Sequence, residues 1–81
     1  MSKTAIDTAN ALLREKGYSE RDLAVHPAPR GKALLKGNAI LSPLSDDAET
    51  VLRIVREAVP ARGELGSHVL RPGDLRTHLS P

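Results

Sequence analysis

Three histidines, His26, His68 and His78, are the side chains best suited to catalysis or metal binding in this 81-residue chain. No two of them stand four residues apart, the spacing that brings two imidazoles to one side of a helix, and the chain has no cysteine to complete a zinc site. Ser67 and Asp74 near His68 supply the residue types of a hydrolytic triad, but the strained Gly-x-Ser-x-Gly turn that exposes such a serine is missing. We therefore expect no enzyme activity, no bound metal and no cofactor.

A stretch of basic residues without acidic neighbours is the feature best suited to a polyanionic partner. Residues 23–44 contain Arg30, Lys32 and Lys36 but no aspartate or glutamate, although the net charge of the chain is only +2. A phosphate backbone would meet unopposed positive charge in this stretch. The predicted nucleic-acid-binding residues are therefore Arg30, Lys32, Lys36 and His26, and an ordinary solvated surface is the alternative.

Tyr18 is the single aromatic side chain, because the sequence has no phenylalanine and no tryptophan. Modules that bind single-stranded nucleic acid stack the bases on exposed aromatic rings, so the composition favours double-stranded DNA as a nucleic-acid partner. The core must also be built from aliphatic residues. Cores of this size rarely contribute more than about 3–5 kcal/mol, so a homodimer is a reasonable expectation.

The hydropathy pattern contains no membrane or export segment. No apolar run is longer than that of Ala39-Ile40-Leu41, which is far short of the roughly 20 residues that cross a bilayer. The first 16 residues include Asp7 and Glu15 where a signal peptide would have a continuous apolar stretch. We expect a soluble, cytoplasmic protein.

Two segments show clear helix patterns. Residues 5–16 carry apolar side chains at helical spacing after Thr4, a residue type that caps helix N-termini. Residues 46–59 follow Ser45 as a cap, have acidic residues in the first turn and present an apolar stripe up to Pro60. Both segments are predicted to form helices.

Two shorter helices are expected between these segments. Ser19 begins a second capping pattern, and Pro29 can occupy the first turn of a helix that runs to Lys36. Residues 39–41 could form either a buried connection or a short strand, because periodicity cannot decide for so short a run.

The C-terminal stretch differs in composition. Residues 61–81 contain closely spaced glycines and prolines and only scattered apolar residues, which is typical of a weakly ordered tail or arm. Arg71-Pro72-Gly73-Asp74 also suits a type II turn, so a small hairpin packed on the domain is the alternative. The predicted fold is mostly α, with a bundle of four short helices in residues 1–60 and an irregular or hairpin-forming tail in residues 61–81.

Two stretches resemble the lambda-repressor/Cro-like helix-turn-helix family. Residues 12–24, LLREKGYSERDLA, are similar to its first two helices, and Ser42-Pro43 with residues 48–58 are similar to its proline-led fourth helix. The resemblance covers about residues 6–59 and implies a trihelical core with a DNA-reading helix within residues 25–37. That segment is atypical for the family, because Pro27, Pro29 and Gly31 are poor helix formers.

The resemblance implies a small DNA-binding protein, a transcriptional repressor that acts by occupying an operator. Arg30, Lys32 and Lys36 would then contact phosphates or guanine edges, with Ser19 as the cap of the second helix. The alternative is a small inhibitor or adaptor of the mobile-element (phage) type that docks on a larger protein. The prolines in the recognition segment and the leucines of the C-terminal tail motivate this second hypothesis.

Overall fold

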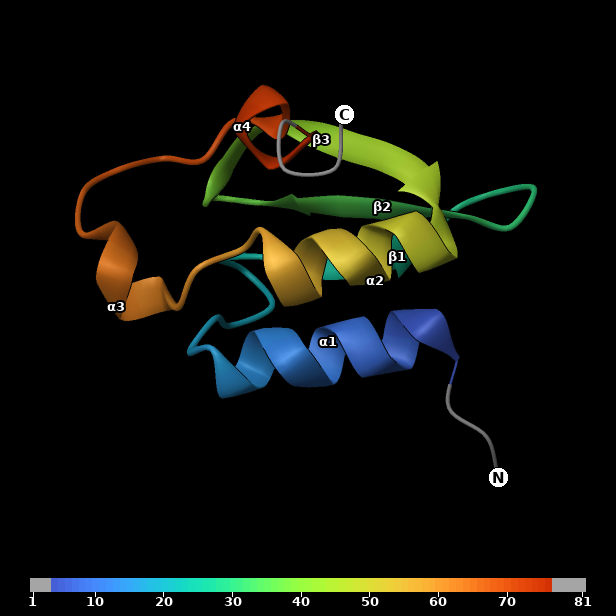
Figure 1. Ribbon diagram of the computed structural model, residues 1–81, viewed down its shortest axis with the longest axis horizontal. Helices are drawn as coiled ribbons and strands as arrows, with labels where there is room; N and C mark the ends of the chain where they lie inside the picture. Colours follow the sequence, from blue (N-terminus) through green and yellow to red (C-terminus); the bar gives the residue numbers. More distant parts are fainter. Residues whose placement is uncertain (1–3, 77–81) are drawn as a thin grey trace.

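The computed structural model describes residues 4–76, which form a mixed α/β domain. Its elements, in chain order, are α1 (Ala5–Glu15), β1 (Ala24–Pro27), β2 (Lys32–Gly37), β3 (Ile40–Asp47), α2 (Ala48–Glu57), α3 (Arg62–Leu65) and α4 (Pro72–Arg76). The strands make one antiparallel sheet in the order β1-β2-β3, and α1 and α2 lie together on one side of it (Figure 1). None of the helices formed by these residues has the length and apolar character needed to cross a membrane.

The prediction of a four-helix bundle is wrong, because residues 24–47 form the sheet. Within β2 the side chains of Ala33 and Leu35 are fully buried, whereas Lys32 and Lys36 are exposed. This alternation has the period of two that is typical of a strand with one covered face. The helix expected from Pro29 to Lys36 is therefore a turn followed by a strand.

The predicted first helix is confirmed. The hydroxyl of Thr4 accepts a hydrogen bond from the Asp7 backbone N–H at 3.1 Å, and the helix stops before Gly17, whose φ is +96°. The helix expected after Ser19 is absent. The Ser19 hydroxyl does accept from the Asp22 N–H at 3.2 Å, but this contact closes only a turn before β1 begins.

The predicted helix over residues 46–59 is present as α2, but it begins later and Asp47 caps it in place of Ser45. The Asp47 carboxylate accepts from the backbone N–H groups of Glu49 and Thr50 at 3.2 and 3.4 Å. Ser45 cannot serve as the cap because it lies within β3, opposite Leu34 of β2. Residues 39–41 were expected to form a strand or a buried connection, and Ile40 and Leu41 are the first two residues of this strand.

The core lies between the sheet and the two longer helices. Leu35 sits at its centre on the middle strand, directly between Val25 of β1 and Leu44 of β3. The helices cover it with side chains that are at most 1% exposed, namely Ala9, Leu13, Val51, Ile54 and Val55. The fold therefore depends on one aliphatic cluster, as the composition predicts.

The segment after Pro60 packs against the domain and is neither an irregular tail nor a hairpin. Up to residue 76 its leucines, Leu65, Leu70 and Leu75, are buried in the core, and Leu70 exchanges two backbone hydrogen bonds with the start of β3. The predicted type II turn at residues 71–74 is instead the beginning of α4. The rest of the predicted tail, with His78, lies outside the described residues.

Asn10 joins α1 to the outer edge of β1. Its side-chain amide accepts from the Val25 N–H at 2.8 Å and donates to the Val25 carbonyl at 2.9 Å, in the manner of a neighbouring strand. Two residues along the same strand, Pro27 has no N–H to offer. Asn10 is a polar residue within the apolar stripe of residues 5–16, and this position is the feature of the sequence that could have indicated the contact.

Candidate nucleic-acid interface

The tight turn between β1 and β2 carries Arg30 at its tip. Arg30 and Gly31 both have positive φ, +63° and +72°, and the Lys32 N–H bonds back to the Pro29 carbonyl at 3.3 Å. Two central residues with positive φ define a type I′ turn, whose twist matches that of antiparallel strands. Figure 1 shows this turn extending beyond the ends of β3 and α2, so its tip stands clear of the rest of the domain.

Three of the four predicted binding residues share one face of the sheet. Lys32, Leu34 and Lys36 alternate along β2 on the face opposite to the helices, and His26 of β1 lies directly across from Leu34. The side chains of His26, Lys32 and Lys36 are exposed, and Leu34 is partly exposed. We call this surface, with Arg30 at the adjoining tip, the basic face.

The basic face has free cations. Within residues 4–76 no hydrogen bond or ion pair joins the side chains of Arg30, Lys32 or Lys36 to another group. By contrast, Arg53 pairs with Glu57 on α2. A phosphate that approaches the basic face therefore does not have to displace an internal partner.

One border of the basic face is acidic. Asp47 of β3 lies directly opposite Lys32, whereas Asp46 lies opposite Ala33, which faces the helices. The Asp47 carboxylate is engaged in capping α2, so this negative charge is fixed beside the end of the sheet. The positive charges of the basic face therefore lie on β2 and on the turn that joins it to β1.

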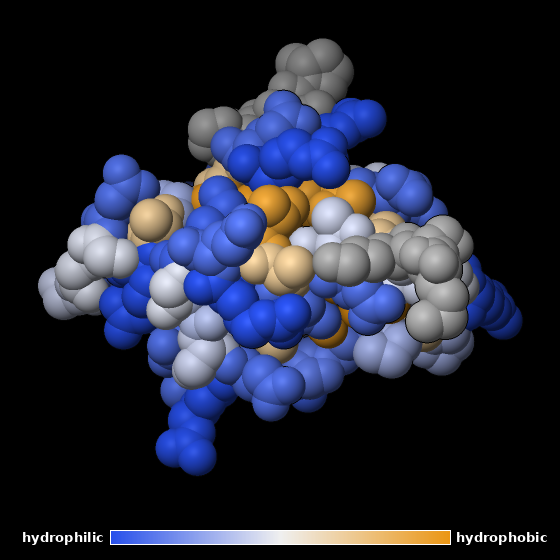
Figure 2. Space-filling model, turned by 90° about the horizontal axis from the view of Figure 1, so that it is seen from below, coloured by the Kyte–Doolittle hydropathy of each residue, from blue (hydrophilic) through white to orange (hydrophobic). Residues whose placement is uncertain are grey.

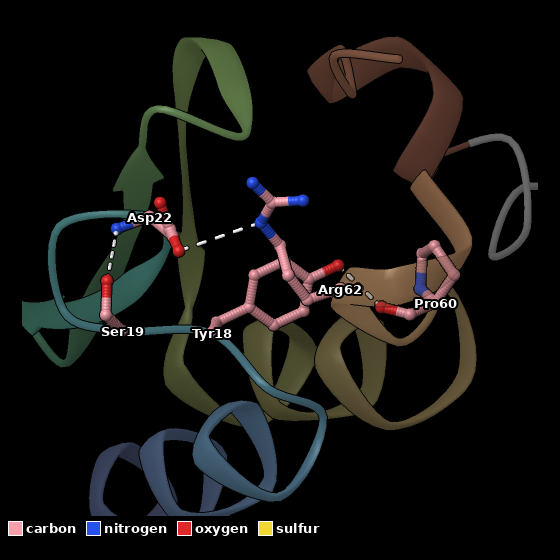
Figure 3. Close-up of polar contacts among 5 residues, drawn as sticks. All are labelled: Tyr18, Ser19, Asp22, Pro60 and Arg62. Carbon is pink, nitrogen blue, oxygen red and sulfur yellow. Dashed lines mark hydrogen bonds and ion pairs between the residues drawn. The ribbon is translucent and has the colours of Figure 1, made fainter. Parts of the chain in front are cut away.

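A second polar cluster, which the sequence did not reveal, joins the loop after α1 to the segment after α2. The Tyr18 hydroxyl donates to the Pro60 carbonyl at 2.5 Å, and the Arg62 guanidinium lies 3.6 Å from the Asp22 carboxylate (Figure 3). The Lys16 ammonium also donates to the Val59 carbonyl at 2.7 Å. These partners are about 40 residues apart in sequence, so no local pattern could have identified the cluster.

The polar cluster borders a small recess of about 160 Å³, lined by Asp22, Asn38, Arg62, Ser67 and His68, among others. The opposite charges of Asp22 and Arg62 largely cancel there, and we assign the cluster a structural role. Ser67 and His68 also line a shallow recess with Asp74, yet no hydrogen bond joins these three side chains within the described part of the chain. The Asp74 carboxylate instead accepts from the Arg71 backbone N–H.

Tyr18 gives the polar cluster a pH dependence that can be measured. Tyr18 is 3% exposed, and burial raises the pKa of its hydroxyl above the usual value. The positive charge of Arg62 lowers this pKa, whereas the negative charges of Glu64 and Asp22 raise it further. Because the folded-state pKa is the higher one, the stability that the neutral hydroxyl contributes is complete below a pH of about 10 and is lost as the pH rises further. Titration of this sole tyrosine, followed by near-ultraviolet absorbance, should show that its hydroxyl ionises at a higher pH in the folded protein than in the unfolded chain.

The variant Tyr18→Phe should lower the free energy of unfolding by about 1 kcal/mol at neutral pH, because it removes one hydrogen bond. It should also make the stability less sensitive to pH above about 10 than that of the wild type. Urea denaturation at neutral and alkaline pH measures both effects. An unchanged alkaline slope in the variant would show that other groups, and not Tyr18, control stability there.

No protein-family model matches the chain, and no curated protein or solved structure matches it either. What its residues do establish is a mixed α/β domain with one sheet face turned away from the helices and lined by basic side chains.

Proposed function

We propose that this protein binds double-stranded DNA through the basic face, and that it acts as a small regulator by occupying its site. One observation carries the proposal: the basic residues of the acid-free stretch all lie on the hairpin of β1 and β2, which presents Arg30, Lys32, Lys36 and His26 to solvent. Exposed cations on one continuous surface are the electrostatic footprint of nucleic-acid binding. Two-stranded β-ribbons can enter DNA grooves, so no recognition helix is required.

Duplex DNA fits this surface better than a single strand does. Stacking of unpaired bases needs exposed aromatic rings. The only aromatic residue, Tyr18, is buried on the helix side of the domain and bonded to Pro60. Basic side chains that have no aromatic residues beside them contact phosphates rather than bases. A duplex presents its phosphates in a regular array.

Fluorescence anisotropy with mixed-sequence duplex DNA at about 50 and 200 mM salt tests the proposal. If Arg30, Lys32 and Lys36 each neutralise one phosphate, the affinity should fall by roughly 40-fold between these two conditions. Each of the variants Lys32→Gln and Lys36→Gln should weaken binding to all sequences and reduce the salt slope by about one.

The matched control is Arg53→Gln, which removes the same charge from the exposed surface of α2. It should leave the affinity unchanged. Equal losses in this control and in the lysine variants would indicate a general effect of net charge. The proposal would be contradicted if the protein did not bind DNA at the lower salt concentration, or if its affinity were the same at both.

A second candidate function, docking on a larger protein, is favoured by an apolar groove. The groove has a volume of about 390 Å³ and runs between the end of α2 and α4. Its apolar part is formed by Ala58, Val59, Leu70 and Leu75, and it is also lined by the charged residues Lys16, Arg56, Glu57 and Asp74. Figure 2 shows hydrophobic surface in a recess on an otherwise largely hydrophilic side of the molecule. An inhibitor or adaptor could use such a groove to hold an apolar side chain of its target.

The variant Ala58→Glu places a charge in the groove and should abolish capture of a protein partner from a cell lysate. Ala61→Glu, at an exposed position outside the groove, is the control. A pull-down that recovers only nucleic acid would dispose of this second candidate and leave the first.

A further inference from the structure

Arg30 holds a backbone conformation that arginine rarely adopts. Its φ of +63° makes it the only residue other than glycine with positive φ in the part of the chain that the structure describes. At the first central position of a type I′ turn, asparagine, aspartate and glycine are the favoured residues. An arginine there raises the energy of the folded state relative to these alternatives.

Nothing within the domain offsets this cost. The Arg30 side chain is exposed and has no hydrogen bond or ion pair with any of residues 4–76. The adjacent Gly31 has no atom within 4 Å of the place where a side chain would begin, so the turn is open to solvent. A strained residue without an internal partner suggests a role toward an external one.

The surroundings of Arg30 restrict how the turn can meet DNA. Only residues 28–31 project beyond the paired strands, because β3 accompanies β2 as far as the pair of Lys32 with Asp47. Deeper insertion into a groove would bring the Asp47 carboxylate, which lies opposite Lys32, against the phosphates. The groove itself therefore receives only a narrow tip that carries one cation, and the lysines of the sheet face stay outside the groove.

The other residues of the tip, Ala28, Pro29 and Gly31, carry small uncharged side chains or, in the case of Gly31, none. They provide no donor or acceptor with which to read the base-pair code of the major groove. They also allow the backbone to approach DNA closely. Recognition by this tip then depends on the guanidinium alone.

We propose that Arg30 enters the minor groove of duplex DNA at A·T-rich sequence, while Lys32 and Lys36 hold the flanking phosphates. The minor groove is about 6 Å wide, which admits a side chain but not a β-ribbon. It is narrowest and most negative in A-tracts, where inserted arginines are favoured. This inference rests on the proposed function, to which it adds a base-composition preference.

The test compares two duplexes of equal length, one with a central A-tract and one rich in G·C, by fluorescence anisotropy at a fixed salt concentration. The wild type should bind the A-tract duplex about tenfold more tightly. The variant Arg30→Asn should bind the two equally, and its thermal midpoint, measured by circular dichroism, should match or exceed that of the wild type because asparagine suits the turn. Arg30→Lys, which keeps the charge, should lose most of the preference because an ammonium is more strongly hydrated.

Three outcomes overturn the inference while leaving the proposed function intact. The wild type could bind both duplexes equally, it could prefer the G·C-rich one, or Arg30→Asn could lose affinity for both by the same factor. The failure of the proposed function is separately visible, because the wild type would then bind neither duplex in a salt-sensitive manner.

Discussion

The variant Leu35→Ala should leave most of the protein unfolded at room temperature. Leu35 is fully buried at the centre of the sheet, between Val25 and Leu44, and belongs to the core cluster that includes side chains of both long helices. Replacing a buried leucine by alanine costs about 2–5 kcal/mol, because it removes apolar contact and leaves a cavity. A core of this size contributes about 3–5 kcal/mol in total, so the loss is comparable to the whole stability. Urea and thermal denaturation followed by circular dichroism measure it.

Leu34→Ala is the matched control, since it removes the same atoms from the neighbouring residue. Leu34 lies on the basic face and is partly exposed, so its replacement should cost less than about 1 kcal/mol. Equal destabilisation by the two variants would mean that both sheet faces are covered. That result would also remove the basis for DNA binding on the basic face.

The variant Gly37→Ala should destabilise the fold almost as severely. A Cβ atom at Gly37 would lie 2.3 Å from the carbonyl oxygen of Asp22 and 2.6 Å from the Cα of Leu23. These are backbone atoms, and they are held in place because the Ala39 N–H donates to the same Asp22 carbonyl at 2.9 Å. Overpacking of this kind costs about 1–3 kcal/mol or more.

Gly63→Ala provides the comparison for Gly37→Ala. Position 63 lies within α3, and a Cβ atom there would meet no atom within 4 Å. Alanine favours helical backbone over glycine by about 1 kcal/mol, so this variant should be as stable as the wild type or more stable. If Gly37→Ala had the same midpoint as Gly63→Ala, the turn after β2 would have to lie away from residues 22–23.

The two long helices could be predicted from sequence because their signals are local. Thr4 and Gly17 mark the ends of α1, and the apolar stripe before Pro60 marks α2. The strands could not, because their pairing depends on residues distant in sequence. The segment from Pro29 to Lys36 begins with proline, which is favoured in the first turn of a helix. It is extended because it pairs with β1 and β3, and this pairing is not visible in the local sequence.

The predicted binding residues remain together although the predicted helix is absent. Lys32 and Lys36 are four residues apart, which is about one turn of a helix and two repeats of a strand. They therefore share a face in either conformation. The strained tip at Arg30 could not be foreseen, because it depends on the turn geometry of a hairpin that the sequence did not predict.

Asn10 also has a consequence for how copies of this protein meet one another. An open strand edge invites a second molecule to extend the sheet, and repeated extension leads to fibrils. Asn10 occupies the outward-facing groups of Val25, Pro27 offers no N–H, and Leu70 is bonded to the start of β3. Both edges of the sheet are thus partly occupied, which limits the joining of two copies strand to strand.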